Sequence, residues 1–247
     1  MALIEAEGVH VRFGDRVVLE QIDLSIPEGE LHGIMGPNGA GKTTFFNVLT
    51  GRVRPSRGRV RLDGEDIGGL SPHAIANKGI ARSFQVMTLF NEFTARENVM
   101  VALPSFRARG FDARRAVAAD AGFAEEADAV LASVGLVDKA AVSAKQLSYG
   151  ERRALEIAVA LAQRPRVLCL DEPTSGLGTD GSTRLAELIG QLKNRLTIIA
   201  VEHDMGFLFS LADRISVIHW GQVVARGTPR ELQQNDWVKK SNLGRFG

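Results

Sequence analysis

The sequence predicts an α/β fold with a mainly parallel sheet, an N-terminal antiparallel β part and an inserted α-helical part. Short apolar segments that indicate strands alternate with segments of helical periodicity, both before residue 86 and after residue 150. Such alternation is typical of a parallel sheet covered by helices. From about residue 94 to 146 the chain is instead rich in Ala, Glu and Arg, with apolar residues at helical spacing. This stretch predicts the helical insertion.

Local patterns predict the individual elements. Residues 3–13 and 17–26 alternate apolar and polar side chains, which predicts two strands joined by a turn at Gly14 and Asp15. The other elements are predicted, in chain order, as a strand at 31–35, a helix that ends near Gly51, strands at 58–63 and 80–85, a helix at 152–162, a strand at 166–170, a helix at 183–193, a strand at 197–201, a helix at 204–212 and a strand pair at 214–226. We expect one core from residues 1–86 and 150–247, and a helical subdomain from about 87–149.

Composition narrows the functional classes. The 30 Lys and Arg residues nearly balance 29 Asp and Glu residues, so no basic field is available for a polyanion and nucleic acid is not an expected partner. The single cysteine, Cys169, excludes a disulfide framework and suits a reduced cytosolic setting. No segment offers the roughly 18 continuous apolar residues of a membrane span, and the N-terminus lacks the pattern of a secretory signal. Any membrane role is therefore expected to come through a partner.

A phosphate-binding motif lies between a predicted strand and a predicted helix. Residues 36–43 match the Walker A pattern G-x-x-x-x-G-K-[ST]. Glycines let backbone N–H groups curl around phosphate oxygens, and the N-terminal end of the helix adds positive charge. We expect Lys42 to reach the β- and γ-phosphates and Thr43 to offer its hydroxyl to Mg²⁺, the alternative being a glycine-rich turn with a surface lysine. The residues predicted to bind nucleotide here are Gly36, Pro37, Asn38, Gly39, Ala40, Gly41, Lys42, Thr43 and Thr44.

A second motif, of the Walker B form, is an apolar strand that ends in two carboxylates, Asp171 and Glu172. A carboxylate at the end of a strand can hold Mg²⁺, and its neighbour can polarise an attacking water. We therefore assign Asp171 to the metal and Glu172 to catalysis, the alternative being a strand followed by a solvated acidic turn. The two motifs together predict a P-loop nucleotidase, a class that many families share.

A third motif, LSYGE at residues 147–151, opens a predicted helix. Ser148 is placed to cap that helix and Glu151 to complete a capping box, and a capped helix alone would explain both residues. The segment also resembles the signature motif LSGGQ of ATP-binding cassette (ABC) ATPases. The resemblance implies that Ser148, Gly150 and Glu151 bind nucleotide, with Ser148 and Gly150 contacting the γ-phosphate that an opposite cassette holds.

Other stretches fall in the order that the ABC family shows, and the resemblance covers essentially the whole chain. It implies that Gln85 senses Mg²⁺ as the Q-loop glutamine, that His203 hydrogen-bonds the γ-phosphate as the switch histidine, and that Phe13 stacks on adenine. Gln85 is thus assigned to both catalysis and the metal. Ordinary structural positions are the alternatives for His203 and Phe13. The family implies a P-loop NTPase core of the RecA type that binds ATP and Mg²⁺ and hydrolyses ATP.

Two residues depart from the family pattern. Tyr149 replaces the first glycine of the signature motif. Gly178 stands at the end of the D-loop segment 174–178, where Asp or Asn is more usual. Tyr149 adds bulk near a closely packed interface, so we expect an effect on the approach of two cassettes. The cross-interface role of Gly178 stays open.

Longer stretches indicate the kind of cassette. The segments IARSFQVMTLFNEFTARENVMVA and VEHDMGFLFSLADRISVIHWGQVVARGTPREL resemble the ATPase subunits of branched-chain (hydrophobic) amino-acid importers. The resemblance implies a second cassette, two transmembrane permeases and, indirectly, a solute-binding protein as partners, on the cytoplasmic face of the inner membrane. Urea, short amides and aromatic acids are alternative solutes. A cassette that works without a permease, and an exporter cassette for lipid or lipopolysaccharide, are the alternative functions.

Two surfaces in the helical part have open interpretations. Residues 87–93 are expected either to accept a coupling helix of the permease or to lie in the core of the helical part. Their apolar members are Met87, Leu89, Phe90 and Phe93. The arginines at 107, 109, 114 and 115 are expected to form a solvated helical face, with the membrane surface or a partner as the alternative.

Overall fold

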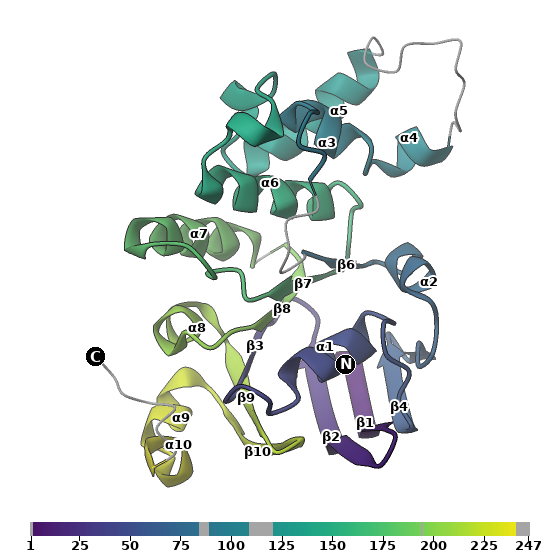
Figure 1. Ribbon diagram of the computed structural model, residues 1–247, viewed down its shortest axis with the longest axis vertical. Helices are drawn as coiled ribbons and strands as arrows, with labels where there is room; N and C mark the ends of the chain where they lie inside the picture. The colour runs from purple at the N-terminus through teal and green to yellow at the C-terminus, as the bar shows by residue number, and fades with distance from the viewer. Residues whose placement is uncertain (1, 84–88, 109–120, 194, 241–247) are drawn as a thin grey trace.

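Two β-sheets and a group of helices make up the computed structural model, which describes residues 2–83, 89–108, 121–193 and 195–240. In Figure 1 the helices from the middle of the chain lie at the top and the two sheets lie below them. Within the described residues, no helix combines the length and the apolar character that crossing a membrane would need.

The smaller sheet is antiparallel, with the strand order β2-β1-β4-β5. Its strands are β1 (Ala2–Phe13), β2 (Arg16–Pro27), β4 (Arg57–Leu62) and β5 (Glu65–Asp66). Alternating apolar residues of β1 and β2 are buried, and they pack in one cluster with Phe45 and Phe46 of helix α1 (Lys42–Leu49). This confirms the predicted N-terminal strand pair.

The larger sheet has the strand order β10-β9-β3-β8-β7-β6. Its strands are β3 (Leu31–Met35), β6 (Ile80–Arg82), β7 (Val167–Asp171), β8 (Thr197–Val201), β9 (Arg214–His219) and β10 (Gln222–Gly227). All neighbouring strands run parallel except β9 and β10. Every residue of β3, β7 and β8 is buried, as expected for a parallel sheet with both faces covered. The predicted α/β fold with a mainly parallel sheet is confirmed.

Helices surround the larger sheet and continue beyond it. Besides α1 they are α2 (Pro72–Asn77), α3 (Ala95–Met100), α4 (Pro104–Ala108), α5 (Ala121–Ser133), α6 (Tyr149–Leu161), α7 (Thr179–Leu192), α8 (Met205–Leu211), α9 (Pro229–Gln234) and α10 (Asp236–Lys240), with 3₁₀ turns η2 (Val137–Lys139) and η3 (Ala144–Gln146). Val99 of α3, Leu131 of α5 and Leu155 of α6 belong to the same buried cluster as Leu168 of β7. The helical part therefore packs directly onto the sheet, and its boundaries near 87 and 149 stay a prediction.

Several elements differ from the sequence-based expectations. Helix α6 begins at Tyr149 rather than 152, because Ser148 caps it, and α7 begins at Thr179 rather than 183. Strand β6 ends at Arg82 rather than 85, and residues 84–88 lie outside the described residues. The predictions lack β5, α2, α9 and α10. For α2 and α9 the signal was present, since each has a capping Ser or Thr followed by Pro.

Gly58 tests how the smaller sheet is built. Its φ is +84°, and a Cβ there would lie 2.2 Å from the carbonyl oxygen of Gly8, where the register of β1 with β4 shifts. We expect Gly58→Ala to lower the free energy of unfolding by about 2–5 kcal/mol, because backbone strain and a clash add together. Urea denaturation measures this loss.

Gly64→Ala is the matched control. Gly64 has a similar φ of +78°, but a Cβ there would meet nothing within 4 Å. Strain alone should then cost about 1–2 kcal/mol. If the two variants lowered the free energy of unfolding equally, this would contradict the close approach of β4 to β1.

Candidate nucleotide site

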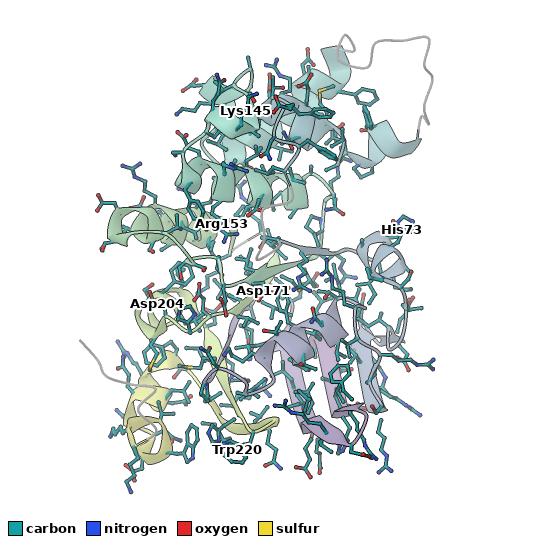
Figure 2. All side chains as sticks on the ribbon, in the orientation of Figure 1. His73, Lys145, Arg153, Asp171, Asp204 and Trp220 are labelled. Atoms are coloured by element: carbon teal, nitrogen blue, oxygen red, sulfur yellow. The ribbon has the colours of Figure 1, made fainter. Side chains whose placement is uncertain are left out.

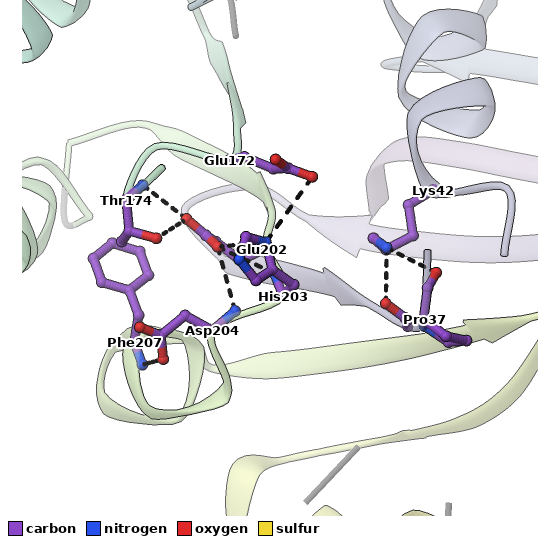
Figure 3. Close-up of polar contacts among 9 residues, drawn as sticks. Pro37, Lys42, Glu172, Thr174, Glu202, His203, Asp204 and Phe207 are labelled. Atoms are coloured by element: carbon purple, nitrogen blue, oxygen red, sulfur yellow. Dashed lines mark hydrogen bonds and ion pairs between the residues drawn. The ribbon is translucent and has the colours of Figure 1, made fainter. Parts of the chain in front are cut away.

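Three loops with predicted site residues leave the same edge of the larger sheet. Because β3, β7 and β8 pair in parallel, their carboxyl ends lie together, where sheets of this kind bind ligands. The loop after β3 leads to Lys42, the loop after β7 begins with Glu172, and the loop after β8 holds His203. Figure 3 shows the three side chains gathered at this edge.

Glycine is required at two points of the Walker A loop. Gly36 has a φ of +152°, and a Cβ there would lie 2.0 Å from the carbonyl oxygen of Ile218 on β9. Gly41 has a φ of +105°, and a Cβ there would lie 2.7 Å from the Leu19 side chain on β2. A residue with a side chain would push the loop away from both strands. The two glycines therefore let the loop lie close against both sheets.

Helix α1 begins directly after this loop. Its N-cap residue, Gly41, has no side chain that could cap it, and the N–H groups of a first helical turn have no partner inside the helix. Together with the positive end of the helix dipole, they form a site for an anion. A cavity of about 310 Å³ lies at this point, lined by Arg16, Val18, Asn38, Gly39, Gly41, Lys42, Thr43, Thr44 and Glu172.

The cavity adds two residues of β2, Arg16 and Val18, that sequence patterns do not predict. The position of Arg16 opposite Phe13 across the β1–β2 turn is the feature that could have pointed to them. Phe13 itself is 53% exposed and is not among the residues that line the cavity. Its contact with adenine stays a prediction.

Lys42 points back into its own loop. Its Nζ donates hydrogen bonds to the carbonyl oxygens of Gly36, at 2.7 Å, and of Pro37, at 3.0 Å. Burial lowers the pKa of this ammonium group, while nearby carboxylates, Glu172 foremost, act in the opposite direction. The loop dipoles thus hold a buried positive charge in place, where phosphate oxygens would find it already oriented.

Asp171 lies in the interior at the end of β7 (Figure 2). Its Oδ2 accepts a hydrogen bond of 2.6 Å from Nη2 of Arg82, and Nη1 of Arg82 donates to Asn47 and Thr50. The guanidinium also lies 4.6 Å from the centre of the Phe46 ring. Burial raises the pKa of Asp171, and Arg82 opposes that rise. Arg82 therefore orients the Walker B carboxylate. Sequence patterns do not predict this role, although the cation ends the strand next to β7.

Glu172 and His203 are neighbours. Oε1 of Glu172 lies 4.0 Å from Nδ1 of His203. Glu172 has a φ of +45°, a left-handed conformation that costs free energy in a residue with a side chain. Its N–H donates to the carbonyl oxygen of Val201 at 2.9 Å, which holds this strained residue against β8. The structure thus brings two predicted catalytic residues together.

The predicted signature residues lie apart from the cavity at the start of α1, which Lys42 lines (the Lys42 cavity). Ser148 caps α6 and Glu151 completes the predicted capping box, in which the N–H of Ser148 donates to Glu151 at 2.8 Å. Ser148, Gly150 and Glu151 line a different cavity of about 540 Å³, between α6 and α7. A single chain therefore does not bring its signature motif to its own Walker A loop.

The unusual Tyr149 links the signature motif to the D-loop segment of the same chain. Its hydroxyl donates to the carbonyl oxygen of Ser175 at 2.8 Å. The ring lies over Gly176, where a Cβ would approach the hydroxyl oxygen to 2.7 Å. Gly178 is the N-cap residue of α7, and a Cβ there would meet no described residue within 4 Å beyond its two chain neighbours.

The predicted metal ligands fit a Mg²⁺ ion as far as they are described. Thr43 lines the phosphate cavity, and Asp171 offers carboxylate oxygens at the end of β7. Among the described residues, no group of three or more His, Cys, Asp or Glu side chains could hold a metal ion. Mg²⁺ needs no such group, since it is commonly held by one or two carboxylates and by substrate phosphates. Gln85 lies outside the described residues, so its role stays a prediction.

Parts of the two predicted surfaces of the helical part also lie outside the described residues. Met87 and the arginines at 109, 114 and 115 lie outside the described residues, and the side chain of Arg107 is not described. Phe90 and Phe93 are 56% and 40% exposed. Their rings stack with centroids 5.1 Å apart.

The comparisons with known sequences agree with this geometry. A family model described as ABC transporter matches residues 19–175. The high-affinity branched-chain amino acid transport ATP-binding protein BraF of Pseudomonas aeruginosa is 41% identical over 249 residues, covering 98% of this chain and 98% of BraF. The lipopolysaccharide export system ATP-binding protein LptB of Haemophilus influenzae is 32% identical, covering 99% of this chain and 98% of LptB.

Solved structures share the fold. The ADP conformation of MJ1267, an ATP-binding cassette of an ABC transporter, has a TM-score of 0.88 at 25% identity, covering 99% of this chain and 100% of that chain. A dimeric post-hydrolysis state of the ATP-binding cassette MJ0796, bound to ADP and Pi, has a TM-score of 0.76 at 27% identity, covering 92% of this chain and 99% of that chain.

The ion pair of Arg82 with Asp171 generates a stability prediction. Arg82→Met keeps most of the side-chain stem but removes the guanidinium that donates a hydrogen bond to the buried Asp171 carboxylate. We expect the free energy of unfolding to fall by about 3–5 kcal/mol, as when one partner of a buried pair is removed. Urea denaturation without nucleotide measures the change.

Arg96→Met is the matched control, because Arg96 pairs with Asp128 and their side chains are 36% and 32% exposed. Solvent screens such a pair, so its loss should cost at most about 1 kcal/mol. If Arg82→Met lowers the free energy of unfolding by no more than Arg96→Met does, the ion pair of Arg82 with Asp171 does not have the stabilising role inferred for it.

Proposed function

Because this chain belongs to the ABC transporter family of ATP-binding cassettes, we propose that it is the ATP-hydrolysing subunit of an importer for branched-chain or other hydrophobic amino acids. The chain is an ATPase of the kind that powers transport. The observation that carries the proposed mechanism is that Lys42 and Glu172 line one cavity and that His203 lies 4.0 Å from Glu172, at one edge of the sheet. The solute is supported by 41% identity to BraF over nearly the whole of both chains.

The Walker A loop binds the triphosphate of ATP. The first-turn N–H groups of α1 and the ammonium group of Lys42 contact the phosphate oxygens. Thr43 and Asp171, with Gln85, would hold Mg²⁺, which would neutralise charge on the phosphates. Arg82 keeps Asp171 oriented from its buried position.

The chemical step belongs to the loops after β7 and β8. Glu172 orients a water molecule for in-line attack on the γ-phosphorus and polarises it. His203, 4.0 Å away from Glu172, donates a hydrogen bond to a γ-phosphate oxygen. At the other end of the nucleotide, Phe13 stacks on adenine. Phe13 pairs with Arg16 across the β1–β2 turn, and Arg16 and Val18 line the cavity that also holds Lys42.

Two cassettes complete each site. Ser148 and Gly150 line a cavity that is separate from the Lys42 cavity of their own chain, so they are placed to serve the nucleotide of an opposite cassette. The N-terminus of α6 supplies the reason, because it presents oriented donors to an anion. The dimeric arrangement of the MJ0796 cassette supports this proposal, in which the second cassette is a copy of this chain or a related one.

The permeases are proposed to dock beside Phe90 and Phe93. The buried Asn98 holds this segment, since its Nδ2 donates to the carbonyl oxygen of Phe90 at 3.1 Å and its Oδ1 accepts from the N–H of Phe90 at 2.8 Å. The two exposed rings thus form an apolar surface on a hydrogen-bonded backbone, which suits a short coupling helix. Through two permeases the chain would lie at the cytoplasmic face of the inner membrane, with a solute-binding protein on the far side.

An exporter cassette is the second candidate function. The 32% identity to LptB over nearly the whole chain favours it, because cassettes of both kinds share the nucleotide site. The higher identity to BraF favours the importer. A cassette that works without a permease finds no support in these similarities.

The assignment of Glu172 generates a kinetic prediction. Glu172→Gln keeps the shape of the side chain but cannot accept a proton, so turnover should fall by roughly 10²-fold or more while ATP still binds. Steady-state phosphate release and equilibrium binding of a fluorescent ATP analogue measure the two quantities. Glu125→Gln, at an exposed position of α5, should leave both unchanged. A turnover of Glu172→Gln close to that of the wild type would contradict the assignment of Glu172 to catalysis.

The transporter proposal is tested by its partners. Tagged Glu172→Gln protein, with ATP present, is recovered from detergent-solubilised membranes, and the bound proteins are identified by mass spectrometry. Two multi-span permeases of the amino-acid importer type, with a second cassette, are the expected partners. Recovery of permeases of an export system would support the exporter function and contradict the importer function. Recovery of non-membrane proteins alone would contradict both functions.

A further inference from the structure

Glu202 is a buried carboxylate that the proposed chemistry does not use. It lies between β8 and His203 and has 0% exposed surface. Its N–H donates to the carbonyl oxygen of Ile34 on β3 at 3.1 Å, which continues the parallel pairing past the end of β8. The backbone of Glu202 is therefore fixed to the sheet, while its side chain turns toward the loops (Figure 3).

The two carboxylate oxygens of Glu202 serve two different loops. Oε1 accepts hydrogen bonds from the N–H and the hydroxyl of Thr174, at 2.8 and 2.6 Å. Oε2 accepts from the N–H groups of His203, at 3.1 Å, and Asp204, at 3.4 Å. Thr174 follows Glu172 by two positions in the chain. One side chain thus ties the loop of the proposed water-orienting carboxylate to the loop of the switch histidine.

The histidine loop is fixed from its other side as well. Oδ1 of Asp204 caps α8 by accepting from the N–H of Phe207 at 3.0 Å. His203 therefore stands between the carboxylate of Glu202 and the start of a helix. A buried carboxylate is stabilised only while its hydrogen bonds are made, so the four donors and Glu202 hold one another in a single arrangement.

We propose that Glu202 is a positioning residue for ATP hydrolysis, which sets the separation between His203 and the loop of Glu172 without contacting ATP. The inference rests on the proposed ATPase function. A displacement of a reacting group by about 1 Å can cost roughly 10²-fold in rate. Weaker hydrogen bonds between Glu202 and the two loops would therefore slow the chemical step. Nucleotide binding depends on the Walker A loop and is left intact.

Glu202→Gln is a suitable probe because it preserves the shape of the side chain, while it replaces one acceptor oxygen by an amide NH₂ group and removes the negative charge. The Thr174 hydroxyl can turn to accept a hydrogen bond from the new amide, whereas the N–H groups of His203 and Asp204 cannot. The glutamine should therefore keep its carbonyl oxygen on the histidine loop and lose the bond to the N–H of Thr174. We therefore expect the variant to fold with a weaker link between the two loops.

The experiment separates turnover from binding. For purified Glu202→Gln we expect kcat for ATP to fall by about 10-fold or more, as a misplaced group predicts, while KM and the Kd of a fluorescent ATP analogue change by less than about twofold. Glu231→Gln is the matched control, because Glu231 also accepts a hydrogen bond from a backbone N–H, that of Thr228 at 2.7 Å, but at the remote start of α9. Its kinetics should equal those of the wild type.

Two results would overturn the inference: an unchanged kcat, or a loss of ATP affinity that accompanies the loss of kcat. If Glu202→Gln fails to fold, Thr174→Val gives the same test, because it deletes only the hydroxyl that donates to Oε1. It should lower kcat about threefold or more at unchanged Kd, the loss expected for one hydrogen bond, and an unchanged kcat would overturn the inference. A wild-type chain that binds ATP without hydrolysing it would overturn the proposed function together with this inference.

Discussion

The parallel pairing of β3, β7 and β8 is the constraint on which the whole site depends. Each strand contributes five buried residues, so its register is set by packing on both faces. A slip of one residue would turn its last side chain to the opposite face of the sheet. Register therefore decides that the loops carrying Lys42, Glu172 and His203 open at one edge. The packing of these three strands therefore both stabilises the fold and sets the geometry of the site.

Buried charges at this edge are balanced by fixed groups. Asp171 is held by Arg82, Lys42 by loop carbonyl oxygens, and Glu202 by four hydrogen-bond donors. A site that is oriented before its ligand arrives need not reorganise during the reaction, which is the main source of electrostatic catalysis. The strained backbone of Glu172 is held by the same surroundings. What this chain does not bring to its own cavity is the signature motif, whose residues line a different cavity.

Local sequence rules predicted much of this arrangement. The Walker A glycines, the carboxylates at the end of β7 and the cap at Ser148 depend on residues close together in the chain, so spacing and capping preferences suffice to find them. Arg82 and Glu202 could not be found in that way. Arg82 meets Asp171 across 89 positions of sequence, and Glu202 meets Thr174 across 28. Both contacts depend on which strands pair, and one sequence does not reveal that order. The role of Gln85 and the boundaries of the helical subdomain stay predictions.

We propose that each ATP is hydrolysed between the Walker A loop of one cassette and the signature motif of another. A complementation experiment can decide this: a chain with Lys42→Ala is mixed with a chain with Ser148→Arg, and ATP hydrolysis by the mixture is compared with hydrolysis by each chain alone. Each variant alone has only defective sites, whereas a mixed dimer has one site with both parts intact. We expect mixing to restore hydrolysis, to roughly a quarter of the wild-type rate if chains pair at random and both sites of a dimer act independently. If the two variant chains form mixed dimers, a mixture no more active than the sum of its two variants would contradict the shared site.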